Sequence, residues 1–130
     1  SFERLLDLLN EDRQYSMDVD IDDISCETDD YFCITLYRVV QECLLNIQKH
    51  SDASKVLFHC KKDNKKYNIV IQDDGKGFSM EDVENKSNNH FGMALIHEGV
   101  ELLDGTIHVN SVIGKGTTIE ITIPTDSYES

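Results

Sequence analysis

The chain has 130 residues, of which 39% are hydrophobic, enough for one domain with a buried core but short for two. Twelve Lys and Arg against 25 Asp and Glu give a formal charge of −13, which disfavours binding to nucleic acid or anionic lipid. No apolar run approaches the roughly 18 residues of a membrane span. The N-terminus lacks the features of a signal peptide, and we expect a single cytoplasmic domain over residues 1–130. Because the sequence has no start Met, we expect it to be a piece of a longer protein.

The hydrophobic pattern predicts helices and strands in mixed order along the chain. An amphipathic helix over 2–12 and a strand over 15–21 come first, and a long helix then begins at 28–30 and ends at His50. Two alternating strands, 54–62 and 66–73, form a hairpin; a polar loop covers 79–91, and a helix at 93–103 precedes strands at 106–110 and 117–123. This pattern favours an α+β, two-layer sandwich in which helices cover one face of a mixed, mostly antiparallel sheet.

The four cysteines and the scattered histidines show no spacing typical of a metal site. Cys26, Cys33, Cys43 and Cys60 include no Cys-x-x-Cys pair, and the histidines stand singly or without paired ligand spacing. We predict reduced and mostly buried thiols, as is usual in a cytoplasmic protein.

The segment Asp73-x-Gly75-x-Gly77 follows directly on a predicted half-buried strand. A carboxylate at a strand end can accept a hydrogen bond from an exocyclic amine. Gly75 and Gly77 permit positive φ and let a flat ligand approach the backbone. By itself the segment is also typical of an ordinary tight turn.

The long helix carries a polar stripe opposite its predicted core face. At about 100° per residue, Glu42 and Asn46 lie one turn apart, with Lys49 on the next turn and His50 beside it. An Asn oxygen can bind Mg²⁺, a Lys can neutralise phosphate, and a Glu can act as a base. The alternative is a stripe that simply faces water. Thr35 and Arg38 are assigned to the same stripe, and Cys33, Leu36, Tyr37, Val40, Cys43, Leu44 and Ile47 to the core face.

Two further glycine motifs lie in the second half. Gly92-Met93 opens a predicted helix, where free N–H groups can bind phosphate. Gly114-x-Gly116-Thr117 precedes a strand and is also compatible with a plain hairpin turn. No Walker or Rossmann glycine pattern occurs in the sequence.

Taken in order, these motifs resemble the N, G1, G2 and G3 boxes of the ATP-binding catalytic domain of two-component sensor histidine kinases. The same superfamily includes type II topoisomerases, heat-shock chaperones and mismatch-repair MutL, and the fold carries an ATP lid. The resemblance covers residues 15–124. One departure is that His90 and Phe91 stand where a second glycine is usual before Gly92.

The resemblance implies a role for each matched residue. Asp73 would bind the adenine amino group with support from Thr117, while Gly75 and Gly77 would shape the base pocket and the hinge of the lid. Gly116 would also lie at the nucleotide. Asn46 would hold Mg²⁺, which an acidic domain needs in order to bind ATP. The resemblance also implies that Glu42 and Lys49 are catalytic residues. It places three further residues at the bound nucleotide: Gly92, Met93 and His50.

The implied function is transfer of the ATP γ-phosphate to a histidine on a separate dimerisation and phosphoacceptor domain, with a response regulator downstream. The fragment would be monomeric and its parent a homodimer that can be anchored in the cell membrane. Two alternatives stay open: a stand-alone serine kinase resembling anti-sigma factors, and a degenerate nucleotide-binding module that binds a protein partner.

Overall fold

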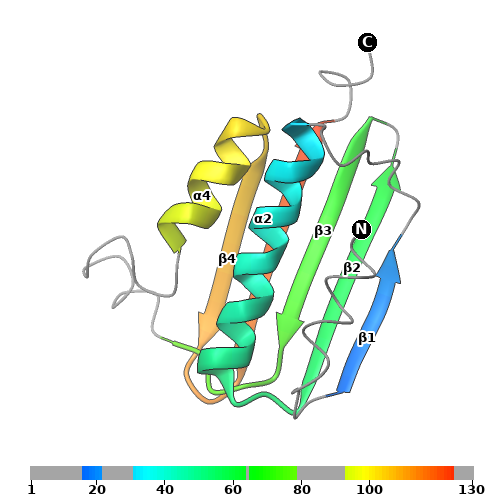
Figure 1. Ribbon diagram of the computed structural model, residues 1–130. Coiled ribbons are helices and arrows are strands. Elements are labelled where there is room, and N and C mark those ends of the chain that lie inside the picture. The colour runs from blue at the N-terminus through cyan, green and yellow to red at the C-terminus, as the bar shows by residue number, and fades with distance from the viewer. Residues whose placement is uncertain (1–15, 22–30, 64, 79–92, 125–130) are drawn as a thin grey trace.

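The fold is a five-stranded sheet with helices on one face (Figure 1). The computed structural model describes residues 16–21, 31–63, 65–78 and 93–124. The helices are α2 (Tyr31–Asn46), its π-helical continuation η1 (Ile47–Ser51) and α4 (Met93–Leu102). The strands are β1 (Ser16–Ile21), β2 (Lys55–Asp63), β3 (Lys66–Asp73), β4 (Thr106–Val112) and β5 (Gly116–Pro124). The predicted α+β sandwich is confirmed.

The sheet has the strand order β1-β2-β3-β5-β4, with β1 parallel to β2 and every other pair antiparallel. The predicted hairpin of β2 and β3 is present, and β3 lies at the centre of the sheet. In the β3–β5 register Asp73 lies opposite Thr117. Two residues 44 positions apart are therefore neighbours at one end of the sheet.

The core fills the space between the sheet and the two helices. Alternate residues of β3 and β5 face the helices because successive side chains of a strand point to opposite sides. Each large apolar side chain that is fully buried contributes roughly 1.5–3 kcal/mol. The largest such residues are Phe58, Leu36, Leu44, Ile69, Ile71, Ile96, Leu103, Ile121 and Ile123.

The predicted helix ending at His50 is helical over its described part, but its last turn is π-helical rather than α-helical. The chain leaves that turn at Asp52, which has a left-handed φ of 53°. The strand predicted at 106–110 extends to Val112, because pairing with β5 continues to Gly116. The helix predicted over 2–12 and the predicted lid over 79–91 lie outside the described residues.

Two side-chain predictions are wrong. Thr35 was assigned to the polar stripe of α2, opposite the core face, yet it is buried. The reason is that α4 packs against α2, where Gly99 lies close to Thr35. Cys33 was expected to be a free thiol, yet it is disulfide-bonded. Cys43 and Cys60 are free and buried, as predicted.

We expect Gly99→Ala to destabilise the protein, because a Cβ at Gly99 would lie 2.4 Å from Cγ2 of Val39. Valine has one strongly preferred rotamer in a helix, so the overlap should cost roughly 1–3 kcal/mol. In a Val39→Ala background the overlap disappears, and the same Gly→Ala change should become neutral or stabilising by roughly 0.5–1 kcal/mol. Urea denaturation of the four proteins measures this sign reversal; equal effects in both backgrounds would contradict close packing at this point.

Candidate functional site

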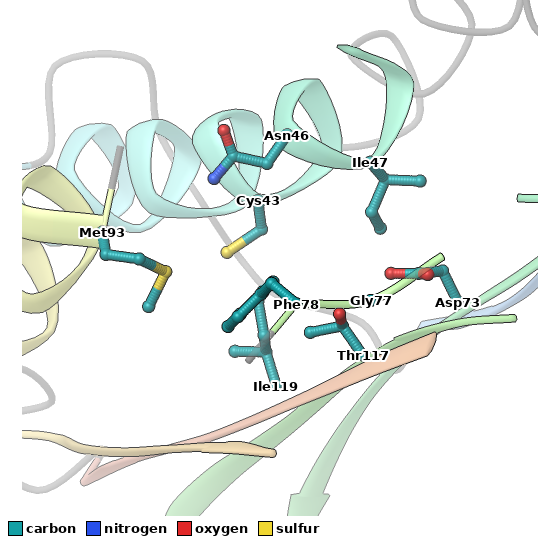
Figure 2. A pocket seen from close by; sticks show the side chains of 9 residues that line it. All are labelled: Cys43, Asn46, Ile47, Asp73, Gly77, Phe78, Met93, Thr117 and Ile119. Carbon is teal, nitrogen blue, oxygen red and sulfur yellow. The ribbon is translucent and has the colours of Figure 1, made fainter. Parts of the chain in front are cut away.

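A pocket lies between the C-terminal end of α2 and the end of the sheet where β3 finishes (Figure 2). Helix residues lie above it, strand residues below it, and the turn after β3 passes beside it. Its cavity volume is about 40 Å³, room for roughly three water molecules. The lining residues are Cys43, Asn46, Ile47, Asp73, Gly77, Phe78, Met93, Thr117 and Ile119.

Asp73 is the acidic group of the pocket and is only 6% exposed. The alternation of β3 turns its side chain toward the helices, and Figure 2 shows the carboxylate directed into the pocket. Burial raises the pKa of Asp73 above its usual value, while hydrogen bonds with the main chain at Gly75 and Thr117 act in the opposite direction. The Gly75 N–H donates to Oδ1 at 2.9 Å, which holds the carboxylate in place. Asp73 is thus a fixed hydrogen-bond acceptor on an otherwise largely apolar wall.

Asp74 has a different task although it is adjacent in sequence. Its Oδ1 accepts hydrogen bonds from the main-chain N–H groups of Ser54 and Lys55, both at 2.8 Å. These bonds, with that from Lys55 first, lower the pKa of Asp74. The Asp74 N–H also donates to the Lys55 carbonyl at 3.2 Å. Asp74 therefore ties the turn after β3 to the start of β2 and keeps Asp73 in register.

Close backbone packing explains two of the predicted glycines. Gly77 has a φ of +62°, and a Cβ there would lie 2.2 Å from the Val112 carbonyl oxygen. Gly116 has a φ of +117°, and a Cβ there would lie 2.0 Å from the Asp73 carbonyl oxygen. Of the two glycines that could permit a positive φ after β3, Gly77 adopts one, whereas Gly75 is not among the described glycines with positive φ. The turn after β3 is thus pressed against the β4–β5 hairpin.

Ser111 on β4 joins that turn to the pocket wall. It is 6% exposed, and its Oγ accepts a hydrogen bond from the Phe78 N–H at 2.9 Å. The same hydroxyl lies 3.2 Å from the Gly116 carbonyl oxygen and 2.7 Å from Oγ1 of Thr117. Three segments of the site therefore meet at one buried oxygen atom.

The helical wall of the pocket combines one amide with apolar groups. Asn46, the last residue of α2, projects its side chain beside Cys43, and Ile47 follows at the start of the π-turn. Burial raises the pKa of Cys43 to about 12, so its thiol stays protonated and acts as an apolar lining group. A π-turn within a helix is frequent at functional sites.

The structure brings together five of the residues singled out in the sequence: Asn46, Asp73, Gly77, Met93 and Thr117. Four others are described but do not line the pocket: Glu42, Lys49, Gly75 and Gly116. Of these, Gly75 and Gly116 act through the backbone at Asp73, as shown above. Gly92 and the side chain of His50 lie outside the described part of the chain.

The sequence interpretation missed the apolar lining and Ser111. Cys43 and Ile47 were assigned to the core, and both are buried as expected. The core assignment did not indicate that they also line a pocket. Phe78 and Ile119 were not singled out as binding residues. A signal was available for Phe78, since an apolar residue directly after a glycine turn needs a place to pack.

Within the described residues no group of three or more His, Cys, Asp or Glu side chains is placed to hold a metal ion. A divalent cation bound here would take one coordinating oxygen from Asn46. Its other coordinating oxygens would come from the bound ligand and from water, as is common for Mg²⁺. No described helix is long and apolar enough to cross a membrane.

A family model described as "Histidine kinase-, DNA gyrase B-, and HSP90-like ATPase" matches residues 33–127. The chain belongs to this family.

Several curated relatives are named as sensor kinases. The chain is 36% identical over 93 residues to the signal transduction histidine-protein kinase/phosphatase DegS of Bacillus subtilis, covering 72% of this chain and 24% of DegS. It is 37% identical over 122 residues to the sensor histidine kinase LiaS of the same organism, covering 92% of this chain and 32% of LiaS. The matched regions thus span 24% and 32% of the length of these two relatives.

Solved structures support the fold. The blue-light activated histidine kinase of Erythrobacter litoralis EL346 superposes with a TM-score of 0.82 at 21% identity, covering 98% of this chain and 42% of that one. The mycobacterial sensor histidine kinase MprB superposes with a TM-score of 0.71 at 20% identity, covering 94% of this chain and 90% of that one.

Proposed function

We propose that this domain binds Mg²⁺-ATP and donates the γ-phosphate to a histidine on a separate dimerisation and phosphoacceptor domain, in two-component signal transduction. The observation that carries the proposal is the buried Asp73 carboxylate, held by Gly75 and facing a pocket whose opposite wall bears Asn46. The family match and the names of the relatives support it.

In this proposal Asp73 selects the base. The Asp73 carboxylate accepts a further hydrogen bond from the 6-amino group of adenine, while Cys43, Ile47, Met93 and Ile119 supply the apolar surface for the ring. Gly77 has no side chain, so the ring can lie directly against its backbone. Gly75 and Gly116 hold the Asp73 main chain and carboxylate, and Thr117 completes the polar edge.

Asn46 is proposed as the protein ligand of Mg²⁺. Its side-chain oxygen is a hard donor suited to that ion, and its position opposite Asp73 leaves the space between them for the rest of the nucleotide. The bound metal neutralises phosphate charge, which a chain of net charge −13 needs. Lys49 adds a positive charge one turn further on. Glu42 is proposed as a catalytic residue. His50 and the main chain at Gly92 are proposed to contact the nucleotide.

The pocket must widen to accept adenine. Its volume of about 40 Å³ is far below the roughly 300 Å³ or more of typical ligand pockets. Met93 has an unbranched, flexible side chain and Phe78 lines the same pocket, so these two side chains are proposed to move when nucleotide binds.

Calorimetric titration of ATP with and without Mg²⁺ tests the proposal. We expect binding to depend on Mg²⁺, and Asn46→Ala to weaken Mg²⁺-ATP by at least about tenfold because an inner ligand is lost. Gln48→Ala removes an exposed amide from the same helical end and should leave binding unchanged. Wild-type protein that is folded yet does not bind ATP would contradict the proposal and favour the protein-binding module.

The phosphoryl acceptor needs its own experiment. We expect the isolated 130 residues to bind nucleotide but to autophosphorylate poorly, and a histidine-bearing dimerisation domain added in trans to become labelled. A response regulator added next should then receive the phosphate. Labelling of a serine on a partner protein would favour the anti-sigma-like kinase instead. The domain itself is proposed to be a cytoplasmic monomer, and its parent a homodimer.

A further inference from the structure

We propose that Ser111 is a positioning residue of the nucleotide pocket: its hydroxyl fixes the main chain at Phe78 and holds the Thr117 hydroxyl so that Thr117 offers only acceptor lone pairs to the ligand. The inference rests on the proposed nucleotide-binding function. It goes beyond that function by assigning a task to a side chain that does not itself line the pocket.

The hydrogen count at Ser111 leads to this assignment. A hydroxyl has one hydrogen to donate and can accept two hydrogen bonds. The Phe78 N–H can only donate to it, and the Gly116 carbonyl can only accept from it. Thr117, 2.7 Å away, must then donate to Ser111 if all three contacts are to be satisfied together. Because Ser111 is buried, an arrangement that satisfies every contact is strongly favoured over one that does not.

This arrangement has a consequence inside the pocket. Once the Thr117 hydrogen is directed to Ser111, the side of Thr117 that faces the pocket carries lone pairs only. Asp73 is also an acceptor, and it lies opposite Thr117 in the β3–β5 register. The polar edge is therefore built to receive donors such as the 6-amino group of adenine. It offers no direct hydrogen to N1, the ring nitrogen next to that group.

The same serine couples the pocket to the turn after β3. Gly77 lies against the Val112 carbonyl, the Gly114 N–H donates to the Lys76 carbonyl at 2.7 Å, and the Phe78 N–H ends on Ser111. Of these contacts, only the last depends on a side chain of the hairpin. Ser111 is thus the point at which substitution can release the turn without altering the backbone of the hairpin.

Nucleotide-free protein tests the first half of the proposal. In Ser111→Ala we expect the amide hydrogen of Phe78 to exchange roughly fivefold faster, since a net hydrogen bond of about 1 kcal/mol is lost. Ser111→Thr keeps the hydroxyl and should restore protection. Asn110→Ala, an exposed neighbour on the same strand, should have no effect. Unchanged exchange at Phe78 in Ser111→Ala would overturn this half.

Paired nucleotides test the second half. ATP and 1-deaza-ATP share the 6-amino group, but the second has C–H in place of the N1 acceptor. In Ser111→Ala the Thr117 hydrogen becomes free to reach N1, so the preference for ATP over 1-deaza-ATP should rise by roughly fivefold. Ser111→Thr and Asn110→Ala should keep the wild-type ratio.

The two possible failures can be told apart. A loss of affinity that is equal for both nucleotides in Ser111→Ala would indicate general damage to the site and would overturn the proposed role toward Thr117. Failure of the wild-type protein to bind either nucleotide would instead contradict the proposed function, while the exchange measurement at Phe78 would still decide whether Ser111 positions the turn.

Discussion

Asp73→Asn is expected to abolish most of the affinity for ATP while leaving the domain folded. An Asn can keep its oxygen toward the Gly75 N–H, but its amide then directs donors at the 6-amino group of adenine, which is itself a donor. Loss of a charge-assisted bond and creation of unpaired donors together cost about 3 kcal/mol, or roughly a hundredfold in affinity. Calorimetric titration measures this change.

Without nucleotide the same variant should be at least as stable as the wild type. Burial raises the pKa of Asp73, so the charged carboxylate is disfavoured in the folded state. The neutral side chain avoids that cost. The pKa of Asp73 is thus higher in the folded state than in the unfolded state. Its contribution to the free energy of unfolding is therefore fully present below the unfolded-state pKa and is lost as the pH rises through the folded-state pKa. Denaturation at neutral pH should show no loss of free energy of unfolding in Asp73→Asn.

Asp74→Asn is the matched control, because it removes the same charge one residue away. It keeps an oxygen for the Ser54 and Lys55 N–H groups, and ATP affinity should stay near the wild-type value. Its effect on stability should have the opposite sign. The lowered pKa of Asp74 implies a stabilising contribution that is present above the unfolded pKa and lost as the pH falls through the folded value. Equal ATP binding by Asp73→Asn and wild type would show that Asp73 does not recognise the base.

The sequence predicted the part of the site that depends on local pattern. The alternation along β3 places Asp73 on the buried face, and two strands joined by a short turn give the β2–β3 hairpin. These inferences need only the period of a strand and the chemistry of a turn. They place Asp73 and Gly77 together where β3 ends. Thr117 was associated with Asp73 only by the resemblance, and the pairing of β5 with β3 brings it there.

Helical arithmetic explains why only part of the stripe on α2 lines the pocket. Measured from Glu42 at about 100° per residue, Asn46 lies about 40° away, Cys43 about 100° and Ile47 about 140°. The pocket therefore faces the boundary between the stripe and the core face rather than the centre of the stripe, and it excludes Glu42. Beyond Asn46 the π-turn adds residues per turn, so a constant 100° no longer locates Lys49.

Long-range pairing explains why Ser111 was missed. The predicted strand ended at Asn110, which left Ser111 in an unassigned turn, where serine is common. Its three partners lie on two different segments, and the Phe78 contact joins residues 33 positions apart. No pattern within a window of the sequence contains that information. It arises only when β4 pairs with β5 and the turn after β3 packs against their hairpin.

The second large effect is expected for Gly116→Ala, which should remove much of the stability of the fold. The new Cβ would lie 2.0 Å from the Asp73 carbonyl oxygen and 3.0 Å from the Asp74 Cα, and both are backbone atoms that cannot rotate away. A non-glycine residue at φ +117° adds conformational strain. Strain and overlap of roughly 1–3 kcal/mol each suggest a loss of about 4 kcal/mol, a large share of the roughly 5–15 kcal/mol of a typical domain.

Gly114→Ala separates the two causes, because Gly114 has a φ of +82° but no atom within 4 Å of its Cβ position. Strain without overlap should cost only about 1–2 kcal/mol. Urea denaturation followed by circular dichroism compares the two variants, and a similar loss in both would show that β5 does not press on Asp73. A larger loss in Gly116→Ala would mean that the contact which positions the proposed adenine-binding carboxylate also holds the end of the sheet together, so the site could not be altered there without loosening the fold.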